Sequence, residues 1–358
     1  MKRVGILTSG GDCPGLNAAI RGVAKASYEL FDVEIIGISD GYKGLITGDY
    51  RIMQNEDFSE LLTLGGTILG TSRQPYKNMR VIGDDNIDKV KSMKENYEKM
   101  KLDCLVTLGG NGTHKTANLL SEEGLNVIGL PKTIDNDLWG TDITFGFHTA
   151  VDIDTEVIDR IHTTANSHGR IIVIEIMGNK AGWLTLYSGM AGGADIVLIP
   201  EIPYDISSVI KAVEERAKKK KRSFAIIAVA EGAMTKEEAV LKSKQRQALR
   251  EKEKFTSISY RLADQISTIT GHESRVVIPG HYQRGGIPSA YDRVLSTRFG
   301  VHAAELIRDG IYGQAVALVG DQITHNLLKD IAGKTKFVPK DHQMVQEAKN
   351  TGISFGDD

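Results

Sequence analysis

The sequence has little of what a secreted or membrane protein needs. Only two of its 358 residues are cysteines, Cys13 and Cys104, so a disulfide framework is excluded and a reducing compartment is expected. No apolar stretch approaches the roughly 20 residues that span a bilayer. Met1-Lys2-Arg3 leads straight into a strand-like segment, without the apolar region of a signal peptide. We therefore expect a cytoplasmic protein with no membrane partner.

The chain also lacks an excess of charge of either sign. Lysine and arginine number 44 against 46 aspartates and glutamates, which gives a formal net charge of -2. Nothing in this balance predicts a broad attraction to nucleic acid or to a membrane surface. Any site for an anion must therefore be local.

Glycine is abundant, and its distribution points to such local sites. The chain has 38 glycines, about a tenth of its residues, where roughly 7% is usual. Many of them stand in short clusters directly after apolar runs, where phosphate-binding turns occur.

The order of apolar and amphipathic segments predicts an α/β fold. Apolar strands without polar alternation, separated by helices, are typical of parallel sheets covered on both faces. In such sheets, ligands bind beyond the carboxyl ends of the strands. The predicted strands are 4–8, 33–39, 102–108, 126–130, 170–177, 196–199, 224–230 and 275–278; the predicted helices are 17–30, 84–100, 113–123, 149–166, 205–220, 256–270 and 290–308, with a polar helical insertion at 235–254.

Two glycine-rich turns follow predicted strands and precede predicted helices. Residues 10–15 and 109–113 let backbone N–H groups approach an anion at a helix N-terminus, although a tight strand-to-helix turn also selects glycine. Thr113 suits the N-cap of its helix. A third glycine-rich stretch, 65–73, ends in Arg73, which is either a surface residue or a guanidinium for a transferring phosphate.

The segment 131–137 carries two carboxylates. Asp135 and Asp137 follow a predicted strand and are two residues apart, so they can converge on one point. Phosphoryl transfer to an alcohol needs one carboxylate to deprotonate the hydroxyl and one to hold the metal. A simple turn stabilised by Asp and Asn side chains explains the same residues equally well.

Basic residues stand at predicted strand ends in the second half of the chain. Arg170 and Arg275 open two strands, and His281 and Arg284 follow the second of these. Guanidinium groups bind the oxygens of a phosphomonoester bidentately. Glu231, after the strand 224–230, can accept hydrogen bonds from sugar hydroxyls or lie on the surface.

These segments together resemble the phosphofructokinase family over most of the chain. The resemblance rests on Thr8–Gly11 with Pro14, Gly15 and Asn17; Leu69–Arg73; Gly109–Thr113; Pro131–Asp137; Ser167–Arg170; Glu175–Gly178; Glu231-Gly232; Gly280–Gly286; and Tyr291–Arg293. It implies two Rossmann-like three-layer α/β/α lobes with mostly parallel sheets and a cleft between them. Residues 1–146 plus 283–330 would form the larger, donor-binding lobe, and 147–282 plus 331–358 the smaller, sugar-phosphate-binding lobe.

The resemblance also implies an activity: transfer of a phosphoryl group from ATP to the 1-hydroxyl of fructose 6-phosphate in glycolysis, with Mg²⁺ as cofactor. Arg170 and Arg275 would reach the 6-phosphate from a neighbouring subunit, so a homodimer or homotetramer with shared active sites is expected. The implied residues are Asp135 as general base with Asp137, Thr133 and Arg73; Gly11, Arg73, Gly109, Gly110, Asn111, Gly112 and Thr113 for the donor; Thr133, Asp135, Arg170, Met177, Gly178, Glu231, Arg275, His281 and Arg284 for the sugar; and Asn111 and Asp137 for the metal.

Two positions bear on the choice of donor, and their signals are mixed. Gly112 stands where members that use pyrophosphate tend to carry Asp, whose side chain would crowd and repel the α-phosphate of a nucleotide. Lys132 is the residue typical of the pyrophosphate users. We expect ATP, because a missing side chain permits a ligand whereas a flexible lysine excludes little.

The sequence departs from the family pattern at two further points. Asn111 replaces an Asp that many ATP users have, and a neutral amide is a weaker ligand for Mg²⁺. Asn179 replaces an Arg that stabilises transition-state charge, and Lys180 beside it could substitute as a point charge. We expect catalysis to survive both changes.

Three other functions fit parts of the pattern. A pyrophosphate-dependent phosphotransferase would share nearly all of these residues. The nucleotide or lipid kinases with a similar glycine loop would need a β-rich C-terminal half. A non-catalytic metabolite sensor would have no need for Asp135 beside Asp137.

Overall fold

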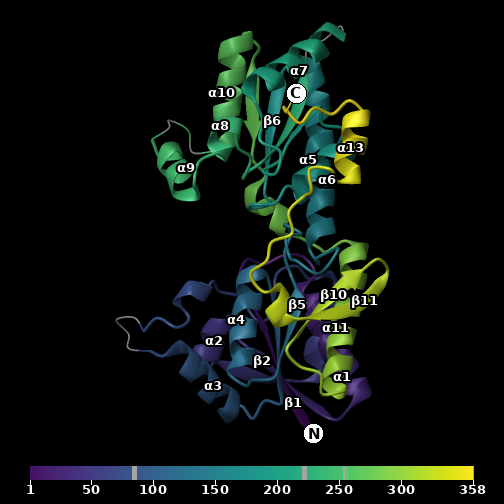
Figure 1. The fold of residues 1–358 in the computed structure, drawn as a ribbon. Coiled ribbons are helices and arrows are strands. Elements are labelled where there is room, and N and C mark those ends of the chain that lie inside the picture. The colour runs from purple at the N-terminus through teal and green to yellow at the C-terminus, as the bar shows by residue number, and fades with distance from the viewer. Residues whose placement is uncertain (83–86, 220–223, 253–254, 256, 358) are drawn as a thin grey trace. The chain divides into compact units, whose positions relative to one another are not determined.

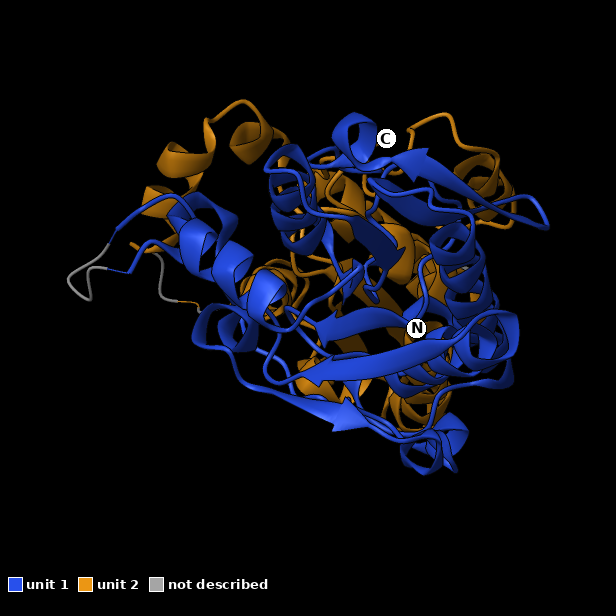
Figure 2. Ribbon diagram, turned by 90° about the horizontal axis from the view of Figure 1, so that it is seen from below, with its two compact units in different colours: residues 1–149, 284–336 blue, residues 150–283, 337–358 orange. Residues whose placement is uncertain are grey.

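The structure is a computed structural model, which describes residues 1–82, 87–219, 224–252, 255 and 257–357. The chain divides into two compact units, each built from two stretches of sequence. Unit 1 comprises residues 1–149 and 284–336, and unit 2 comprises residues 150–283 and 337–358 (Figure 2). Within the described residues, no helix combines the length and the apolar character needed to cross a bilayer.

Unit 1 is built on a seven-stranded sheet of order β11-β10-β5-β4-β1-β2-β3. Its central strands are parallel, and only the edge strands β3 and β11 pair antiparallel with their neighbours. The elements are β1 (Lys2–Thr8), α1 (Leu16–Leu30), β2 (Val33–Ile38), α2 (Tyr42–Thr47), β3 (Tyr50–Met53), α3 (Lys89–Lys99), β4 (Cys104–Gly109), α4 (Asn111–Glu122), β5 (Val127–Pro131), α11 (Ala290–Arg308), β10 (Gln314–Val319), β11 (Gln322–Leu327) and α12 (Leu328–Ile331) (Figure 1).

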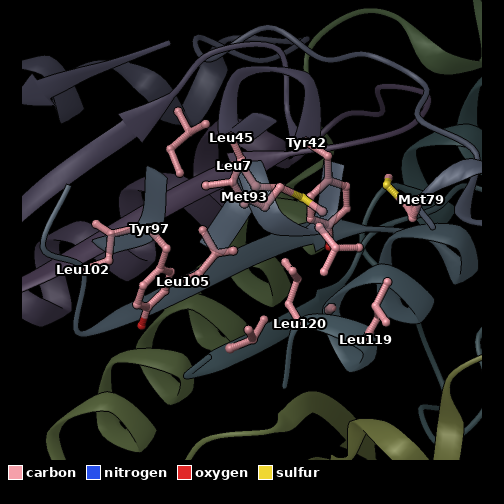
Figure 3. Packing of buried hydrophobic residues seen from close by; sticks show 14 of the residues in the cluster. Leu7, Tyr42, Leu45, Met79, Met93, Tyr97, Leu102, Leu105, Leu119 and Leu120 are labelled. Atoms are coloured by element: carbon pink, nitrogen blue, oxygen red, sulfur yellow. The ribbon is translucent and has the colours of Figure 1, made fainter. Parts of the chain in front are cut away.

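Helices cover both faces of this sheet, which makes unit 1 three-layered. On one face, apolar side chains of α2, α3 and α4 pack onto β1, β2 and β4, with Leu7, Met93 and Leu120 fully buried (Figure 3). On the other face, α1 packs against α11. The two helices approach closely at Gly22 and Gly300, where a Cβ would lie 2.8 Å and 2.5 Å from backbone atoms of the facing helix.

Unit 2 is built on a four-stranded, fully parallel sheet of order β7-β8-β6-β9. Its strands are almost wholly apolar, because both faces are covered. Side chains of α7 and α10 form the core on one face, and α6 packs against β7 and β8. The elements are α5 (Phe147–His168, which begins in unit 1), β6 (Ile171–Ile176), α6 (Trp183–Ala191), β7 (Ile196–Leu198), α7 (Ile206–Lys219), β8 (Ala225–Ala230), α8 (Lys236–Ala239), α9 (Ser243–Arg250), α10 (Ile258–Thr270), β9 (Ser274–Val277) and α13 (Gln343–Asn350).

The predicted α/β class with mostly parallel sheets is confirmed, and every predicted strand is present within two residues of its expected ends. Three strands were not predicted: β3, β10 and β11. The polar insertion forms the short helices α8 and α9. Residues 84–86, 220 and 256 of predicted helices, and 253–254 of the insertion, lie outside the described residues.

Candidate active site

Apart from Arg73, the predicted donor-binding and catalytic residues of unit 1 lie at the ends of three strands that are neighbours in the sheet. β5, β4 and β1 lie side by side and parallel, so their carboxyl ends share one edge. From β1 the chain moves to β2 on one side, and from β4 it moves to β5 on the other side. The strand order therefore reverses between β1 and β4, which is where α/β sheets bind ligands.

Hydrogen bonds tie the first glycine turn to the loop that ends in Arg73. The backbone N–H of Gly10 donates to Ser72 O at 3.1 Å, and the hydroxyl of Thr71 donates to Gly10 O at 2.7 Å. Arg73, the next residue, is exposed. The fold thus places the backbone of the Arg73 loop directly beside the turn that holds Gly11.

Two cationic side chains lie against Gly11. A Cβ on this residue would stand 2.5 Å from Nη1 of Arg284, so glycine is needed for the guanidinium to take this place. The ammonium of Lys132 donates a hydrogen bond to Gly11 O. Burial lowers the pKa of Lys132, and the carboxylate of Asp135 is among the charges that oppose this shift.

The expectation that Lys132 is flexible is therefore wrong. Its side chain is 5% exposed, and its ammonium is anchored on the glycine turn. The physical reason is that the side chain ends on the turn after β1, while the backbone N–H of Lys132 donates to Gly109 O at the end of β4 at 3.1 Å. This places a fixed positive charge in the middle of the cluster.

The second glycine turn, residues 109–113, has a different N-cap residue from the one predicted. Helix α4 begins at Asn111 with Gly110 as N-cap, so Thr113 lies inside the first turn and is not the N-cap. Its side chain is buried, and its hydroxyl donates to Ser9 O at 3.4 Å, which links α4 to the end of β1. The N–H groups of the first turn of α4 lie at this sheet edge, where they favour an anion.

Asn111 is engaged by the chain itself. Its Oδ1 accepts from Gly333 N at 2.8 Å, and its Nδ2 donates to Lys334 O at 3.1 Å. The side chain thus fastens the segment after α12 to the start of α4. A neutral amide used in this way offers little to a metal ion, so Asn111 is a poor candidate for a ligand.

Gly112 lies on the open side of the same helical turn. Among the described residues, and apart from its chain neighbours and the backbone of its own helix, a Cβ built on Gly112 meets no heavy atom within 4 Å. The absence of a side chain here is not required by packing. It leaves space beside the glycine turn.

The two carboxylates of the 131–137 segment have different neighbours. The hydroxyl of Thr133 accepts from Asp135 N at 3.1 Å, and Asn136 adopts a left-handed conformation with φ of 51°. Burial lowers the pKa of both Lys132 and Lys336; the charge of Asp135 opposes the shift at Lys132, and the charge of the buried Asp137 opposes it at Lys336. That the two carboxylates converge on one point therefore stays a prediction.

Lys336 was not predicted as a site residue. Its ammonium donates to Asn136 Oδ1 at 3.1 Å, Thr141 O at 2.9 Å and Asp142 O at 2.6 Å. Burial lowers the pKa of Lys336 to about 8. Lys336 belongs to no motif and lies 200 positions from Asn136, so only the fold reveals it.

The predicted sugar-binding residues of unit 2 fall into two groups. The first lies after the carboxyl ends of β6 and β8. Glu231 Oε1 accepts from Gly178 N at 3.3 Å and Asn179 N at 2.7 Å, and the buried Gln283 accepts from Met177 N at 3.0 Å. These bonds fix the turn 177–179, in which Asn179 adopts a left-handed φ of 54° that suits Asn better than Arg. Glu231 thus has a structural contact that the sequence did not predict.

His281 and Arg284 belong to one short 3-10 helix, Gly280–Arg284. His281 is exposed. The boundary between the units falls within this helix, so His281 is counted in unit 2 and Arg284 in unit 1.

The second group lies at the opposite edge of the same sheet. Arg170 precedes the first residue of β6, and Arg275 pairs with Ile172 near that end. Met177 follows the last residue of β6, so about 20 Å of strand separates the two groups at ~3.3 Å per residue. Within one copy of unit 2, therefore, the arginines do not join Met177 and Glu231.

The insertion forms the wall of a pocket beside the first group. Helices α9 and α10, with Glu231 at the end of β8, line a cavity of about 700 Å³. The wall is held by Glu238, which is 3% exposed and forms ion pairs with Arg250 at 2.8 Å and Arg261 at 3.0 Å. No residue of α9 is buried, so the ion pair between Arg250 and Glu238 anchors this helix in place of an apolar core.

Among the described residues, no group of three or more His, Cys, Asp or Glu side chains has the arrangement of a metal site. Cys13 and Cys104 are both buried and free, as their small number led us to expect.

Known proteins resemble this chain over nearly its whole length. The sequence model of a family described as Phosphofructokinase matches residues 3–307. An ATP-dependent 6-phosphofructokinase of Spirochaeta thermophila is 56% identical over 99% of this chain and 97% of its own length. A pyrophosphate–fructose 6-phosphate 1-phosphotransferase of Amycolatopsis methanolica is 46% identical over 94% of this chain and 96% of its own.

A solved structure gives the same result. The chain superposes on phosphofructokinase from Pichia pastoris in its T-state with a TM-score of 0.80 and 31% identity, covering 98% of this chain and 36% of that one. Sequence and fold thus agree over nearly the whole chain, and the protein belongs to the phosphofructokinase family.

Proposed function

We propose that this protein transfers the γ-phosphoryl group of ATP to the 1-hydroxyl of fructose 6-phosphate, giving fructose 1,6-bisphosphate and ADP. The observation that carries the proposal is the cluster at the edge of β1, β4 and β5. There Asp135, a candidate base, lies beside a fixed lysine and two glycine turns that can take phosphates. Unit 1 would hold the donor, and unit 2 would hold the sugar phosphate.

Asp135 is the general base in this mechanism. It takes the proton of the 1-hydroxyl, the sugar oxygen forms a bond to the γ-phosphorus, and the bond between that phosphorus and the β-phosphate oxygen breaks. Lys132 and Arg73 stabilise the charge on the phosphoryl oxygens, as cations do in phosphoryl transfer generally. The N–H groups at the start of α4 bind donor oxygens.

Mg²⁺ fits this site through few protein ligands. It is usually held by one or two carboxylates together with substrate phosphates, so Asp137 suffices where Asn111 does not. When bound, the ion neutralises charge on the donor phosphates. The opposite charges of Asp137 and Lys336, which interact with each other, would then both lie near the proposed base, Asp135.

The choice of ATP rests on Gly112. The open space at its Cβ position accommodates a nucleotide phosphate that an Asp side chain would crowd and repel. Pyrophosphate is a second candidate because Lys132 presents a fixed charge at the donor turn, and because one relative named above uses pyrophosphate by its name. A flexible lysine could move away from the donor, whereas the buried Lys132 stays at the donor turn. Its burial therefore favours pyrophosphate more than a flexible side chain would.

The sugar-binding residues support a shared active site. If Arg170 and Arg275 bind the 6-phosphate while Glu231 Oε2, His281 and the turn 177–179 bind the sugar, the two groups must come from different copies of the chain, since they lie at opposite edges of one sheet. We infer a homodimer or homotetramer in which each site takes the arginines from a neighbour.

A coupled assay tests the proposal. The purified protein with Mg²⁺ and fructose 6-phosphate is given ATP or pyrophosphate, and fructose 1,6-bisphosphate is measured. We expect faster turnover with ATP. Faster turnover with pyrophosphate would support the second candidate, and a rate equal to background with both donors would favour a non-catalytic sensor.

A further inference from the structure

Glu273 joins the two arginines at the amino edge of the unit 2 sheet. Its Oε2 accepts from Nε of Arg170 at 2.8 Å, and its Oε1 accepts from Nη2 of Arg275. Arg275 is further fixed through Nη1, which donates to Ser274 O at 3.2 Å. One carboxylate thus holds two guanidinium groups that come from different strands.

The strand pairing explains why the three residues meet. β6 and β9 are parallel, with Ile171 beside Ser274, so Arg170 and Glu273 occupy matching positions just before the two strands. The backbone N–H of Ile171 donates to Glu273 O at 3.1 Å, which fixes this register. The geometry is therefore set by the sheet and not by chance contact of long side chains.

We propose that Glu273 is a positioning residue that holds Arg170 and Arg275 side by side as a preformed site for the phosphate of the sugar substrate. The inference rests on the proposed function, which assigns the phosphate to these two arginines. Glu273 itself does not touch the substrate in this proposal.

Charge and exposure favour this role over a role in folding. The side chains of Arg170, Glu273 and Arg275 are 32%, 44% and 57% exposed, and ion pairs this exposed contribute little to stability. Two guanidiniums with one carboxylate leave a net positive charge for a phosphate. Each guanidinium has five N–H donors, so the contacts with Glu273 leave others for the ligand.

Positioning by Glu273 has an expected effect on binding. Holding two long side chains in place before the substrate arrives reduces the rotamer freedom that binding must remove. Without Glu273, the like charges of Arg170 and Arg275 would repel each other and the side chains would separate. The expected consequence is weaker binding of the sugar phosphate with unchanged chemistry.

The test is steady-state kinetics of Glu273→Gln, with Glu273→Asp as the charge-conserving variant and Glu214→Gln, an exposed residue of α7, as the matched control. We expect KM for fructose 6-phosphate to rise about threefold to tenfold with kcat unchanged. Glu273→Asp should recover part of the loss. The KM and kcat of the control Glu214→Gln should equal those of the parent protein. The melting temperatures of all three variants should also equal that of the parent.

Two outcomes overturn the inference. An unchanged KM in Glu273→Gln shows that the arginines need no positioning, and a lowered KM shows that Glu273 competes with the phosphate instead. Arg170→Ala and Arg275→Ala separate this from the proposed function. If they raise KM while Glu273→Gln does not, only the role of Glu273 fails; if they also leave KM unchanged, the assignment of the phosphate to this edge fails with it.

Discussion

The two sheets use their edges in different ways. In unit 1, the segments after three adjacent strands meet at one carboxyl edge, and backbone hydrogen bonds connect them, from Ser9 N to Leu108 O and from Lys132 N to Gly109 O. In unit 2, the residues expected to bind the sugar phosphate divide between both edges. There side-chain carboxylates, Glu231 at one edge and Glu273 at the other, hold the neighbouring groups.

From this difference we expect the two units to contribute differently to the active site. Groups that gather at one edge of a sheet can all come from one chain, which suits the proposed site for the donor and the base. Residues at opposite edges of one sheet lie too far apart to bind the same substrate molecule within one chain. They suit two sites, each shared between two copies of the chain. The predictions below test each half of the comparison, beginning with the largest expected effect.

Removing the base should have the largest effect. Asp135→Asn keeps the size of the side chain but cannot accept the proton of the sugar hydroxyl. We expect kcat to fall by about 10²- to 10⁴-fold, the usual contribution of a general base, while binding of fructose 6-phosphate changes little. Asp152→Asn, an exposed position on α5, is the control. A rate equal to that of the parent protein would rule out Asp135 as the base.

Removing the carboxylate that anchors the wall of the unit 2 pocket should cost stability. Glu238→Gln leaves Arg250 and Arg261 without their counter-charge, and breaking a buried ion pair costs about 3–5 kcal/mol. Urea unfolding of this variant measures the loss, with exposed Glu237→Gln as control. Equal unfolding midpoints for both variants would show that ion pairs do not anchor α9.

The same residue gives a pH dependence with a defined sign. Burial alone would raise the pKa of Glu238, but hydrogen bonds from Arg250 and Arg261 outweigh it and lower the pKa from 4.5 to about 2. The carboxylate therefore stabilises the fold fully above pH 4.5, and this stabilisation is lost as the pH falls toward 2. The stability of Glu238→Gln should show a smaller decrease over that range than that of the parent.

The donor position should give the smallest of these effects. Gly112→Asp places a carboxylate in open space, so folding should be unaffected. We expect KM for ATP to rise by at least about tenfold, or about 1.4 kcal/mol, through repulsion of the nucleotide phosphates. Gly112→Ser controls for size without charge. An equal loss with pyrophosphate as donor would show that the substitution does not discriminate between donors.

The sequence was sufficient for the parts of the fold that local patterns encode. Apolar runs such as 171–176 and 225–230 identified the buried parallel strands, and the glycine turns marked their carboxyl ends. The unpredicted strands lie at or next to sheet edges. β11 is half-exposed and largely polar, and β3 is mostly exposed, so neither has the apolar run of a central strand.

Several contacts of the site could not be predicted, because they join segments that are far apart in the sequence. Asn111 meets Gly333 across 222 positions, and Lys336 meets Asn136 across 200. The buried ammonium of Lys132 meets Gly11 across 121 positions, which no local pattern encodes. Likewise, only the alignment of β6 with β9 shows that Glu273 lies between Arg170 and Arg275.

Subunit mixing tests the account most directly. Asp135→Asn lacks the base and Arg170→Ala with Arg275→Ala lacks the phosphate site, so each variant alone should be nearly inactive at low fructose 6-phosphate. In a hybrid, one site combines an intact Asp135 from one chain with intact arginines from the other. We predict that mixtures in which native mass spectrometry detects hybrids regain activity beyond the sum of the two variants. Hybrids that form without any gain in activity would contradict a site shared between chains.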